Sequence, residues 1–305
     1  MDISIIIVSW NTRDLLKKCL ESIYARTRGT SFEIFVIDNG SRDKTIETVR
    51  QEFPDVITVS NTENRGFAGA NNQGIRKAKG RYVLLLNPDT ELKNNALLGM
   101  ANFMDKKSPV CGVAGCHLLN ADLSHQNSVR RFPGVLDQVI ILLKLHRLFP
   151  GLAPISFYLA SDFDYSKETS VDQVMGAFFM IRRETLEKVG MLDERNFFNW
   201  FEEVDFCRRA RECGYEIWYT PSAEVIHHYG QSFRQVMLFA KQRMWNRSLR
   251  RYFRKHHSVI EYSVIASVSW IALGMVWCMD LVKRILAPRQ PTASPMSPKS
   301  VLPSP

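Results

Sequence analysis

The chain has 305 residues, of which 45% are hydrophobic and 23% are charged, and its formal net charge is +9. This composition excludes an intrinsically disordered chain and allows one large α/β domain with an appendage. The charge is concentrated, because residues 231–260 contain eight Lys or Arg and neither Asp nor Glu, so the remainder is close to neutral. The six cysteines include no C-x-x-C pair and show no disulfide framework, which favours reduced thiols in the cytosol.

The first apolar run, after an acid at position 2, is too short for a signal peptide and predicts a strand. Short runs rich in Ile and Val then alternate with helical spacing, a pattern typical of βαβ units. We therefore predict an α/β fold with a Rossmann-like, mostly parallel sheet flanked by helices. The predicted strands span residues 2–10, 32–38, 55–60, 81–87 and 111–118.

Polar residues follow several of these strands. Ligands of such sheets bind beyond the carboxyl ends of the strands. We therefore expect Trp10 and Asn11, residues 38–41 and residues 87–89 to converge on one crevice.

The pattern is irregular from about residue 119 to 170 and then resumes. We predict a strand and a short helix within 171–190, a helix over 201–213 that ends at Gly214, a strand over 215–220 and a further segment over 223–228. Past Gly230 the chain is helical and basic, and the last 18 residues contain six prolines, which predicts disorder. We divide the chain into a main domain over 1–230, helices over 231–287 and a tail over 288–305.

Seven motifs in chain order carry a family resemblance: IIIVSWN, VIDNGSRD, NRGFAGANNQG, LLLNPDT, MGAFFMIRR, FEEVDFCRR and HHYGQS. Together they resemble the family 2 glycosyltransferases of GT-A fold, particularly the rhamnosyltransferase-like members, over roughly residues 3–255. A single motif of this kind is weak, whereas seven in order are specific. The resemblance implies an inverting transfer from a nucleotide-sugar donor.

The resemblance places a nucleobase or ribose contact at Asp38, with Asn11 and Asn64 nearby. In the third motif, Gly66, Gly69 and Gly74 allow tight backbone beside a ligand, and Asn71 offers an amide. Gly176 fits a close approach to the sugar or the acceptor, although it can equally be a simple strand glycine.

Asp89 is the predicted metal ligand at the end of the fourth strand. A divalent cation stabilises a departing diphosphate, and Mg²⁺ or Mn²⁺ is typically held by one or two carboxylates plus phosphate oxygens. The commoner family pattern has two aspartates, and Asn87 occupies the first place here. This favours Mn²⁺ with a histidine ligand. The resemblance indicates His227 as the first candidate for this ligand and His228 as the second. The alternatives are that Asp89 is a helix N-cap and that His227 is an interior histidine.

The predicted base lies among three adjacent acids. An inverting transfer needs a carboxylate that removes the proton of the acceptor hydroxyl. The resemblance assigns this role to Glu203, sugar-hydroxyl binding to Glu202, and an ion pair with Arg208 or Arg209 to Asp205. Helix-end electrostatics is the alternative explanation for these acids.

The basic segment predicts an amphipathic helix, followed by an apolar run from Tyr262 to Met279 that is at the lower limit for crossing a bilayer. A spanning helix, an in-plane anchor and a helix pair packed on the main domain are all compatible with it. We expect a truncation after Gly230 to leave a soluble domain that binds the donor. The helical wheel places Arg243, Arg247, Arg250, Arg251 and Arg254 on one face, and Leu238, Trp245, Leu249 and Phe253 on the other.

The sequence thus predicts a metal-dependent glycosyltransferase at the cytoplasmic face of the cell membrane. The expected acceptor is a lipid-linked or cell-surface glycan precursor, and the resemblance favours dTDP-rhamnose as donor. A sugar nucleotidyltransferase is an alternative, but its glycine- and arginine-rich loop is absent after the first strand. A nucleic-acid-binding protein that uses residues 231–260 is another, although no nucleic-acid motif is present there.

Overall fold

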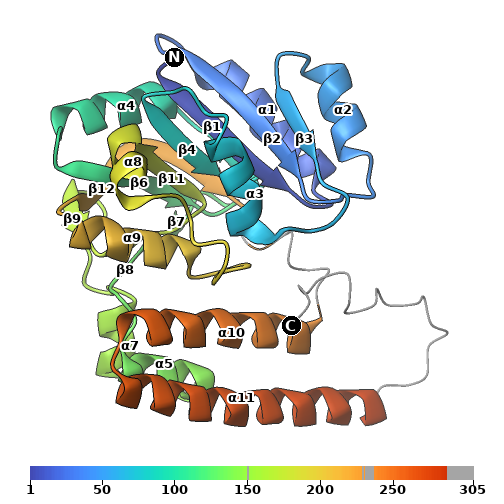
Figure 1. Cartoon of the computed structure of the whole chain (residues 1–305), viewed down its shortest axis with the longest axis vertical. Helices are drawn as coiled ribbons and strands as arrows, with labels where there is room; N and C mark the ends of the chain where they lie inside the picture. The colour runs from blue at the N-terminus through green and yellow to red at the C-terminus, as the bar shows by residue number, and fades with distance from the viewer. Residues whose placement is uncertain (150, 229, 231–236, 287–305) are drawn as a thin grey trace.

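The computed structural model describes residues 1–149, 151–228, 230 and 237–286. Its centre is a mixed, mostly parallel sheet flanked by helices, as the sequence predicted (Figure 1). Four parallel strands form one half in the order β3-β2-β1-β4. These are β1 (Ile3–Ser9), β2 (Phe32–Asp38), β3 (Ile57–Ser60) and β4 (Tyr82–Leu86).

The other half of the sheet is built from segments further along the chain. β11 (Phe178–Arg182) lies antiparallel between β4 and β6 (Cys111–Leu119), and β12 (Glu216–His227) runs parallel to β6. The two predicted segments 215–220 and 223–228 are therefore one strand, whose register shifts between Thr220 and Glu224. β5 (Thr90–Leu92), which the sequence did not suggest, pairs with the end of β12 and brings Thr90 opposite His227.

Each face of the sheet is covered by helices. Alternation along β1 sends Ile5 and Ile7 into one apolar cluster and Ile6 and Val8 into the other. The first cluster includes residues of α1 (Arg13–Arg26), α2 (Thr45–Glu52) and α4 (Ala96–Lys106), and the second includes residues of α3 (Gly66–Ile75), α8 (Arg183–Val189) and α9 (Glu202–Glu212).

The irregular stretch after β6 forms short elements below the sheet. β7 pairs with β6 and β9 pairs with β12, so both join the main sheet, whereas β8 and β10 make a separate two-stranded sheet. The elements are β7 (His125–Gln126), β8 (Val129–Arg130), α5 (Val135–Leu142), α6 (Leu145–Leu148), α7 (Ala153–Tyr158), β9 (Thr169–Val171) and β10 (Gln173–Val174).

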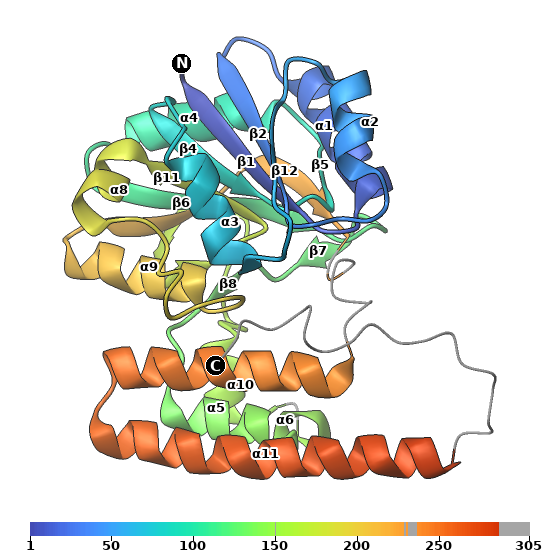
Figure 2. The ribbon, with the colours of Figure 1, turned by 45° about the vertical axis from the view of Figure 1, so that its right-hand side comes forward.

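A separate helical layer lies beneath the sheet domain and consists of α10 (Leu238–His256), α11 (Val259–Leu286) and α5 (Figure 2). Its apolar cluster is shared with the sheet domain, because Phe201 and Val204 pack with Leu249 and Phe253 of α10 and Ile265 of α11. The predicted boundary at residue 230 therefore does not separate two cores. The predicted tail 288–305 lies outside the described residues.

Both predicted faces of α10 take part in packing. On the apolar face Leu249 and Phe253 are fully buried, whereas Leu238 at the start of the helix is 45% exposed. Its cationic side is also divided, because Arg251 donates to the Asn196 carbonyl at 2.7 Å and Lys255 pairs with Asp193 at 2.8 Å. The reason is that α10 lies between the sheet domain and α11, so that both sides of the helix make contacts with the protein.

Candidate active site

A cavity of about 510 Å³ opens at the carboxyl ends of the strands, as expected for a sheet of this kind. Trp10 follows β1, Asn39 follows β2, and Asn87, Pro88 and Asp89 follow β4. The predicted convergence of these three segments is therefore observed. The remaining wall comes from β8, β10, the start of α9, and Lys241 and Met244 of α10.

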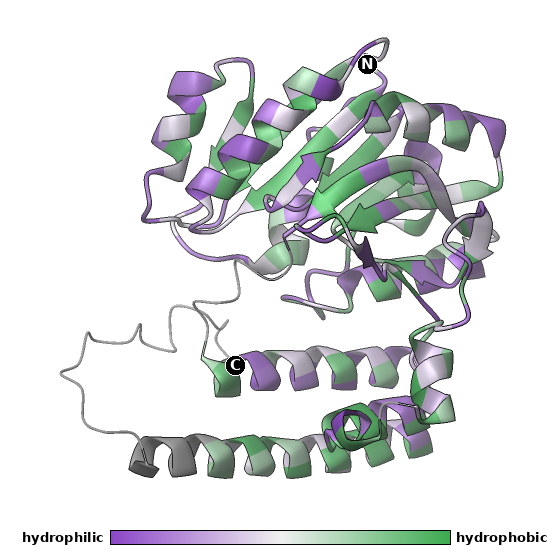
Figure 3. Ribbon diagram, turned by 180° about the vertical axis from the view of Figure 1, so that it is seen from behind, coloured by the Kyte–Doolittle hydropathy of each residue, from purple (hydrophilic) through white to green (hydrophobic). Residues whose placement is uncertain are grey.

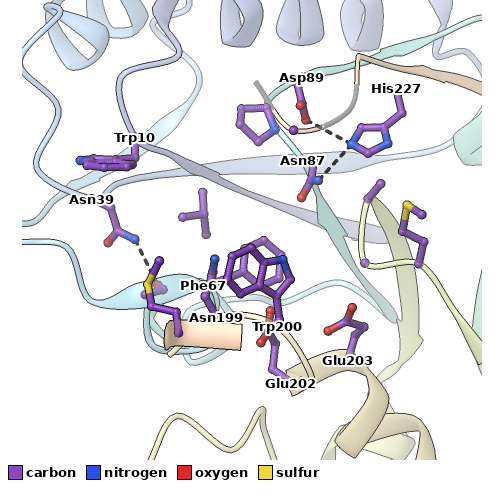
Figure 4. A pocket seen from close by; sticks show the side chains of 18 of the residues that line it. Trp10, Asn39, Phe67, Asn87, Asp89, Asn199, Trp200, Glu202, Glu203 and His227 are labelled. Carbon is purple, nitrogen blue, oxygen red and sulfur yellow. Dashed lines mark hydrogen bonds and ion pairs between the residues drawn. The ribbon is translucent and has the colours of Figure 1, made fainter. Parts of the chain in front are cut away.

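Asp89 and His227 meet on one side of this cavity (Figure 4). The Asp89 Oδ1 lies 3.4 Å from the His227 Nε2, and the Asn87 Nδ2 lies 3.3 Å from the same nitrogen. Asp89 and His227 are 4% and 3% exposed. β5 and β12 bring them together, whereas His228 turns to Glu91 at 2.8 Å. Of the two predicted histidines, only His227 therefore lines the cavity.

Gln126 fixes the orientation of His227. Its Oε1 lies 2.7 Å from His227 Nδ1, while its Nε2 donates to Asn120 Oδ1 at 2.8 Å and to the His227 carbonyl at 3.2 Å. Because the amide nitrogen serves two oxygens, the Oε1 must accept from Nδ1–H. The Nε2 lone pair then faces Asp89 and the cavity, which is the tautomer that a metal-binding imidazole needs.

These side chains suit a divalent cation. A carboxylate and an imidazole nitrogen are typical ligands of Mn²⁺, and a carboxylate with phosphate oxygens is typical of Mg²⁺. Within the part of the chain that the structure describes, no group of three or more His, Cys, Asp or Glu side chains forms a complete metal cage. A cation held here would therefore take further ligands from phosphate or water.

Glu202 and Glu203 point into the cavity from the start of α9, across from Asp89 and His227 (Figure 4). Trp200 and Phe201, which precede them, have φ of 64° and 71°, a left-handed backbone that aromatic residues seldom adopt. Strain of this type persists only where the surrounding structure enforces it and is concentrated at functional sites. Here the left-handed backbone at Trp200 and Phe201 starts α9 so that both carboxylates face the cavity.

The two carboxylates are poorly solvated. One oxygen of each is buried and has no hydrogen-bond partner. Burial, reinforced by the neighbouring Glu203 charge, raises the pKa of Glu202 well above its ordinary value. Burial also raises the pKa of Glu203, against the opposing charge of Arg130. Such groups hold or release a proton at higher pH than an exposed glutamate, as a general base requires.

Asp205, the third acid, has a different role. It is fully buried, and it pairs with Arg209 at 2.8 Å, Lys255 at 2.7 Å and His256 at 2.7 Å. Burial acts to raise its pKa, but these partners outweigh burial and lower it. The predicted pair with Arg209 is present, and the two partners from α10 join the sheet domain to the helical layer.

Three of the predicted donor contacts besides Asn87 and Asp89 line the cavity: Asn64, Gly66 and Gly176. Gly66 has φ +74°, and a Cβ there would lie 2.2 Å from the Phe198 carbonyl oxygen, so only glycine fits. A Cβ on Gly176 would make ordinary contact with Glu203 at 3.7 Å. Packing within the protein therefore requires glycine at Gly66 and not at Gly176, and the predicted approach of Gly176 to the sugar or the acceptor stays a prediction.

Asn11, Asp38 and Asn71 are not among the residues that line the cavity, and their predicted contacts with the donor stay predictions. The Asn11 Oδ1 accepts from the Arg42 amide, the Asp38 Oδ2 accepts from the Ser41 amide, and the Asn71 amide donates to the Phe67 carbonyl. Their side chains hold turns and a helix, since short polar side chains satisfy nearby backbone groups. Asp38 keeps one buried oxygen without a partner, and burial raises its pKa.

Gly69 and Gly74 also require correction. A Cβ on Gly74 would lie 2.6 Å from Ile6, and one on Gly69 would approach Glu194 at 3.4 Å. Both glycines therefore allow α3 to pack closely on the protein itself and do not border the cavity.

Four residues of the site have no counterpart in the sequence reasoning: Gln126, Arg130, Lys241 and Met244. Gln126 and Arg130 lie in the irregular stretch, which offered no motif. Lys241 and Met244 lie on a helix assigned to the appendage. Their basic and apolar side chains gave no indication of a position in the cavity wall.

The family model for "Glycosyl transferase family 2" matches residues 4–190. The chain belongs to glycosyl transferase family 2. This match covers Asp89 and the strands of the sheet before β12, while the α9 acids and His227 lie beyond it.

Known members of the family support this assignment. The chain is 25% identical to the low-salt glycan biosynthesis hexosyltransferase Agl10 of Haloferax volcanii, over 90% of this chain and 85% of that protein. It is 26% identical to the N-acetylglucosaminyl-diphospho-decaprenol L-rhamnosyltransferase of Mycobacterium tuberculosis, over 75% of this chain and 76% of that one. The predicted rhamnosyltransferase-like resemblance is thereby confirmed.

A solved structure confirms the GT-A fold. The mannosyltransferase PcManGT from Pyrobaculum calidifontis, in complex with GDP-Man and Mn2+, superposes with a TM-score of 0.56 at 17% identity. The match covers 94% of this chain and 76% of that one. At this identity the likeness concerns the fold.

Proposed function

We propose that this chain is an inverting glycosyltransferase that moves a sugar from a nucleotide-sugar donor to a hydroxyl of a lipid-linked or cell-surface glycan precursor. The observation that carries the proposal is that one cavity has Asp89 and His227 on one side and Glu202 and Glu203 facing them (Figure 4). A cation-binding pair and a desolvated carboxylate are the two groups that such a transfer needs.

The donor diphosphate lies beside Asp89 and His227 in this proposal. Mn²⁺ or Mg²⁺, when bound there, supplies positive charge to the departing diphosphate. Asp89 offers an oxygen, and His227 offers Nε2, the ring nitrogen that Gln126 does not bind. The PcManGT structure is a complex with GDP-Man and Mn2+, which supports a divalent cation.

Glu203 is the proposed base. Its burial raises its pKa, so its carboxylate is a better proton acceptor than an exposed one. Glu202, only 4% exposed, is proposed to hold a sugar hydroxyl. Trp200 beside them offers an aromatic face to a sugar ring.

The relatives suggest the substrates. A rhamnosyl donor is favoured by the mycobacterial relative, which is named for rhamnosyl transfer to a diphospho-decaprenol acceptor. An acceptor carried on a lipid diphosphate would place the enzyme at the cytoplasmic face of the membrane. We keep dTDP-rhamnose as the first donor to test.

The test combines binding with turnover. Purified protein is screened against nucleotide-sugars by thermal unfolding, with Mn²⁺, with Mg²⁺ and with EDTA, since a ligand that binds the native state raises the unfolding temperature. We expect one sugar nucleotide to stabilise the protein in the presence of cation only. Asp89→Ala should abolish this cation-dependent stabilisation, and stabilisation that persists in EDTA would refute the metal role.

Glu203→Gln tests the base. The amide preserves shape and removes the proton acceptor, so turnover should fall about 10²–10⁴-fold while donor stabilisation is retained. Glu212→Gln, at the exposed end of the same helix, is the matched control and should leave both unchanged. Near-normal turnover of Glu203→Gln would move the role to Glu202.

A further inference from the structure

The outer side of α11 is apolar where a surface helix is normally polar. Its inward stripe, which includes Ile265, Ala272 and Val276, is buried at helical spacing. Its outward side carries Trp270 at 63%, Ile271 at 56% and Trp277 at 57% exposure. From Tyr262 to Met279 no residue is charged. A helix of a soluble protein would place polar residues on that side.

The apolar surface extends beyond one helix. In Figure 3 much of α11 is coloured hydrophobic along the outer edge of the molecule. α5, which packs on α11, and α6, which packs on α5, add further large exposed side chains, Leu136 at 61% and Leu148 at 71%. Exposed apolar side chains that gather on neighbouring helices mark a contact with a partner or a membrane.

Cationic side chains border this surface. Arg243, Arg247, Arg250 and Arg254 recur along one stripe of α10, and the Arg250 guanidinium lies 4.8 Å from the Trp270 ring. Between residues 237 and 279 the single acidic residue is Glu261. Apolar residues flanked by arginines and tryptophans suit an anionic lipid surface, where the rings lie at headgroup level.

Length and composition alone allow α11 to cross a bilayer, because Val259–Met279 has a mean hydropathy of 1.7 over 21 residues. Its packing opposes this. The Asn246 amide donates to the Ser269 carbonyl at 2.8 Å, and α10 lies along α11 (Figure 2). If α11 crossed the hydrocarbon core, α10 would enter it with its arginines, which is costly.

We propose that the outward side of α11 docks in the plane of an anionic phospholipid bilayer, with α10 and the sheet domain above it. The enzyme is then attached to one leaflet and does not span the membrane. Trp270 and Trp277 lie at the headgroup boundary, and the arginine stripe of α10 contacts anionic headgroups.

This docking also deepens the proposed function, on which the following consequence rests. α10 borders both surfaces, because Lys241 and Met244 line the cavity while Asn246 holds α11. Packed helices are about 8–10 Å apart. The cavity wall therefore lies about one helix layer above the lipid, which suits an acceptor sugar joined to its lipid by a diphosphate.

The docking is tested with the full chain and vesicles of phosphatidylcholine, with and without phosphatidylglycerol. We expect sedimentation with the anionic vesicles and a partial loss of binding in high salt, because salt screens the arginines and not the apolar side chains. The double variant Ile271→Glu with Trp277→Glu should bind at least about tenfold more weakly. Ile57→Glu, an equally exposed isoleucine on the distant strand β3, is the matched control and should bind like wild type.

Depth distinguishes docking from spanning. Trp270 and Trp277 are seven residues apart, or about 10 Å along the helix. Lipids brominated at shallow or deep acyl positions quench tryptophan according to depth, and Trp270→Phe and Trp277→Phe isolate each contribution. In-plane docking predicts equal, shallow quenching for both rings, with Trp218→Phe as an unaffected control. Depths that differ by about 10 Å would overturn the proposal in favour of a spanning helix.

Two other outcomes would also overturn the docking. If the protein does not bind vesicles but forms a dimer, and the double variant does not, this surface belongs to a contact with a second copy of the chain. If the protein does not bind vesicles and is a monomer, the lipid proposal is wrong. Cation-dependent donor stabilisation, measured without vesicles, reports separately on the proposed function, so the two failures are distinguishable.

Discussion

The sheet domain and the helical layer distribute polarity in opposite ways. In the sheet domain, apolar strands are enclosed by helices, and polar side chains gather where strands end, as Asn87 and Asp89 do. In the helical layer, polar groups such as Gln242 and Asn246 are buried between helices, whereas Trp270 and Trp277 face outward. The first arrangement is that of a soluble domain with a site, and the second is that of a surface made for an apolar neighbour.

The two regions are nevertheless one structure. Asp205 of α9 binds Lys255 and His256 of α10, and the third apolar cluster contains residues of both regions. α10 even completes the cavity with Lys241 and Met244. The difference in polarity therefore reflects different neighbours and does not mark independent folding units.

Truncation after Gly230 gives the strongest test of this unity, and it reverses our expectation from sequence. The truncated chain should aggregate and lose donor stabilisation, because Phe201 and Val204 lose their apolar partners and Asp205 loses its contacts with Lys255 and His256. Thermal unfolding and size-exclusion chromatography measure this. A truncation after Leu286, which keeps both helices, is the control. A soluble, donor-binding chain ending at Gly230 would show that the regions fold separately.

Asp205→Asn breaks the polar link alone. The substitution removes the charge of a fully buried carboxylate that accepts from Arg209, Lys255 and His256, so the free energy of unfolding should fall by about 1.5–3 kcal/mol. Because the folded pKa of Asp205 is lowered, its contribution is complete above the ordinary pKa near about 4 and is lost as pH falls through the folded pKa. The difference between variant and wild type in urea unfolding should therefore shrink in acid.

Glu52→Gln is the control for that experiment. It removes an exposed ion pair with Lys17, which should change stability by less than about 1 kcal/mol. If both substitutions have equally small effects, the two regions are joined by apolar packing alone.

Gln126→Leu tests how the sheet domain prepares its polar site. His227 loses the acceptor that fixes its tautomer, so Mn²⁺ affinity should fall about 10–100-fold. Binding is measured by electron paramagnetic resonance of Mn²⁺ in the presence of nucleoside diphosphate, which does not depend on turnover. Gln126→Glu keeps an acceptor for Nδ1 and should restore most of the affinity. Unchanged affinity in Gln126→Leu would mean that His227 is not a ligand.

Arg130→Gln should have the smallest effect, on the pH profile. The rate of sugar transfer should fall as pH drops, because protonation of Glu203 removes the base. The midpoint of this pH dependence should lie above the ordinary glutamate pKa. Arg130 lowers the pKa of Glu203, so its removal should move this midpoint to higher pH. Arg131→Gln, which breaks an exposed pair with Asp162, is the matched control and should leave it in place. A shift to lower pH would exclude Glu203 as the titrating base.

Much of the sheet domain could be predicted from the sequence, because its determinants are local. Strand-length runs such as Ile3–Ser9 are buried on both faces, and the parallel order brings Trp10, Asn39 and Asp89 to one edge without further information. The positions of Glu202 and Glu203 followed from a motif. That the Asp38 and Asn71 side chains hydrogen-bond nearby backbone groups could not be predicted, because a motif identifies a residue but not the direction in which a short polar side chain turns.

The sequence by itself determined the alternation of strands and helices up to β4, the chemistry available at the strand ends and the apolar character of residues 262–279. Only the tertiary structure decided which groups meet. Gln126 and His227 are far apart in the chain and become partners because β7 and β12 both pair with β6. Likewise, whether an apolar stripe is core or surface depends on what packs against it. The burial of Leu249 and the exposure of Trp270 could therefore be known only from the packing of α10 between the sheet domain and α11.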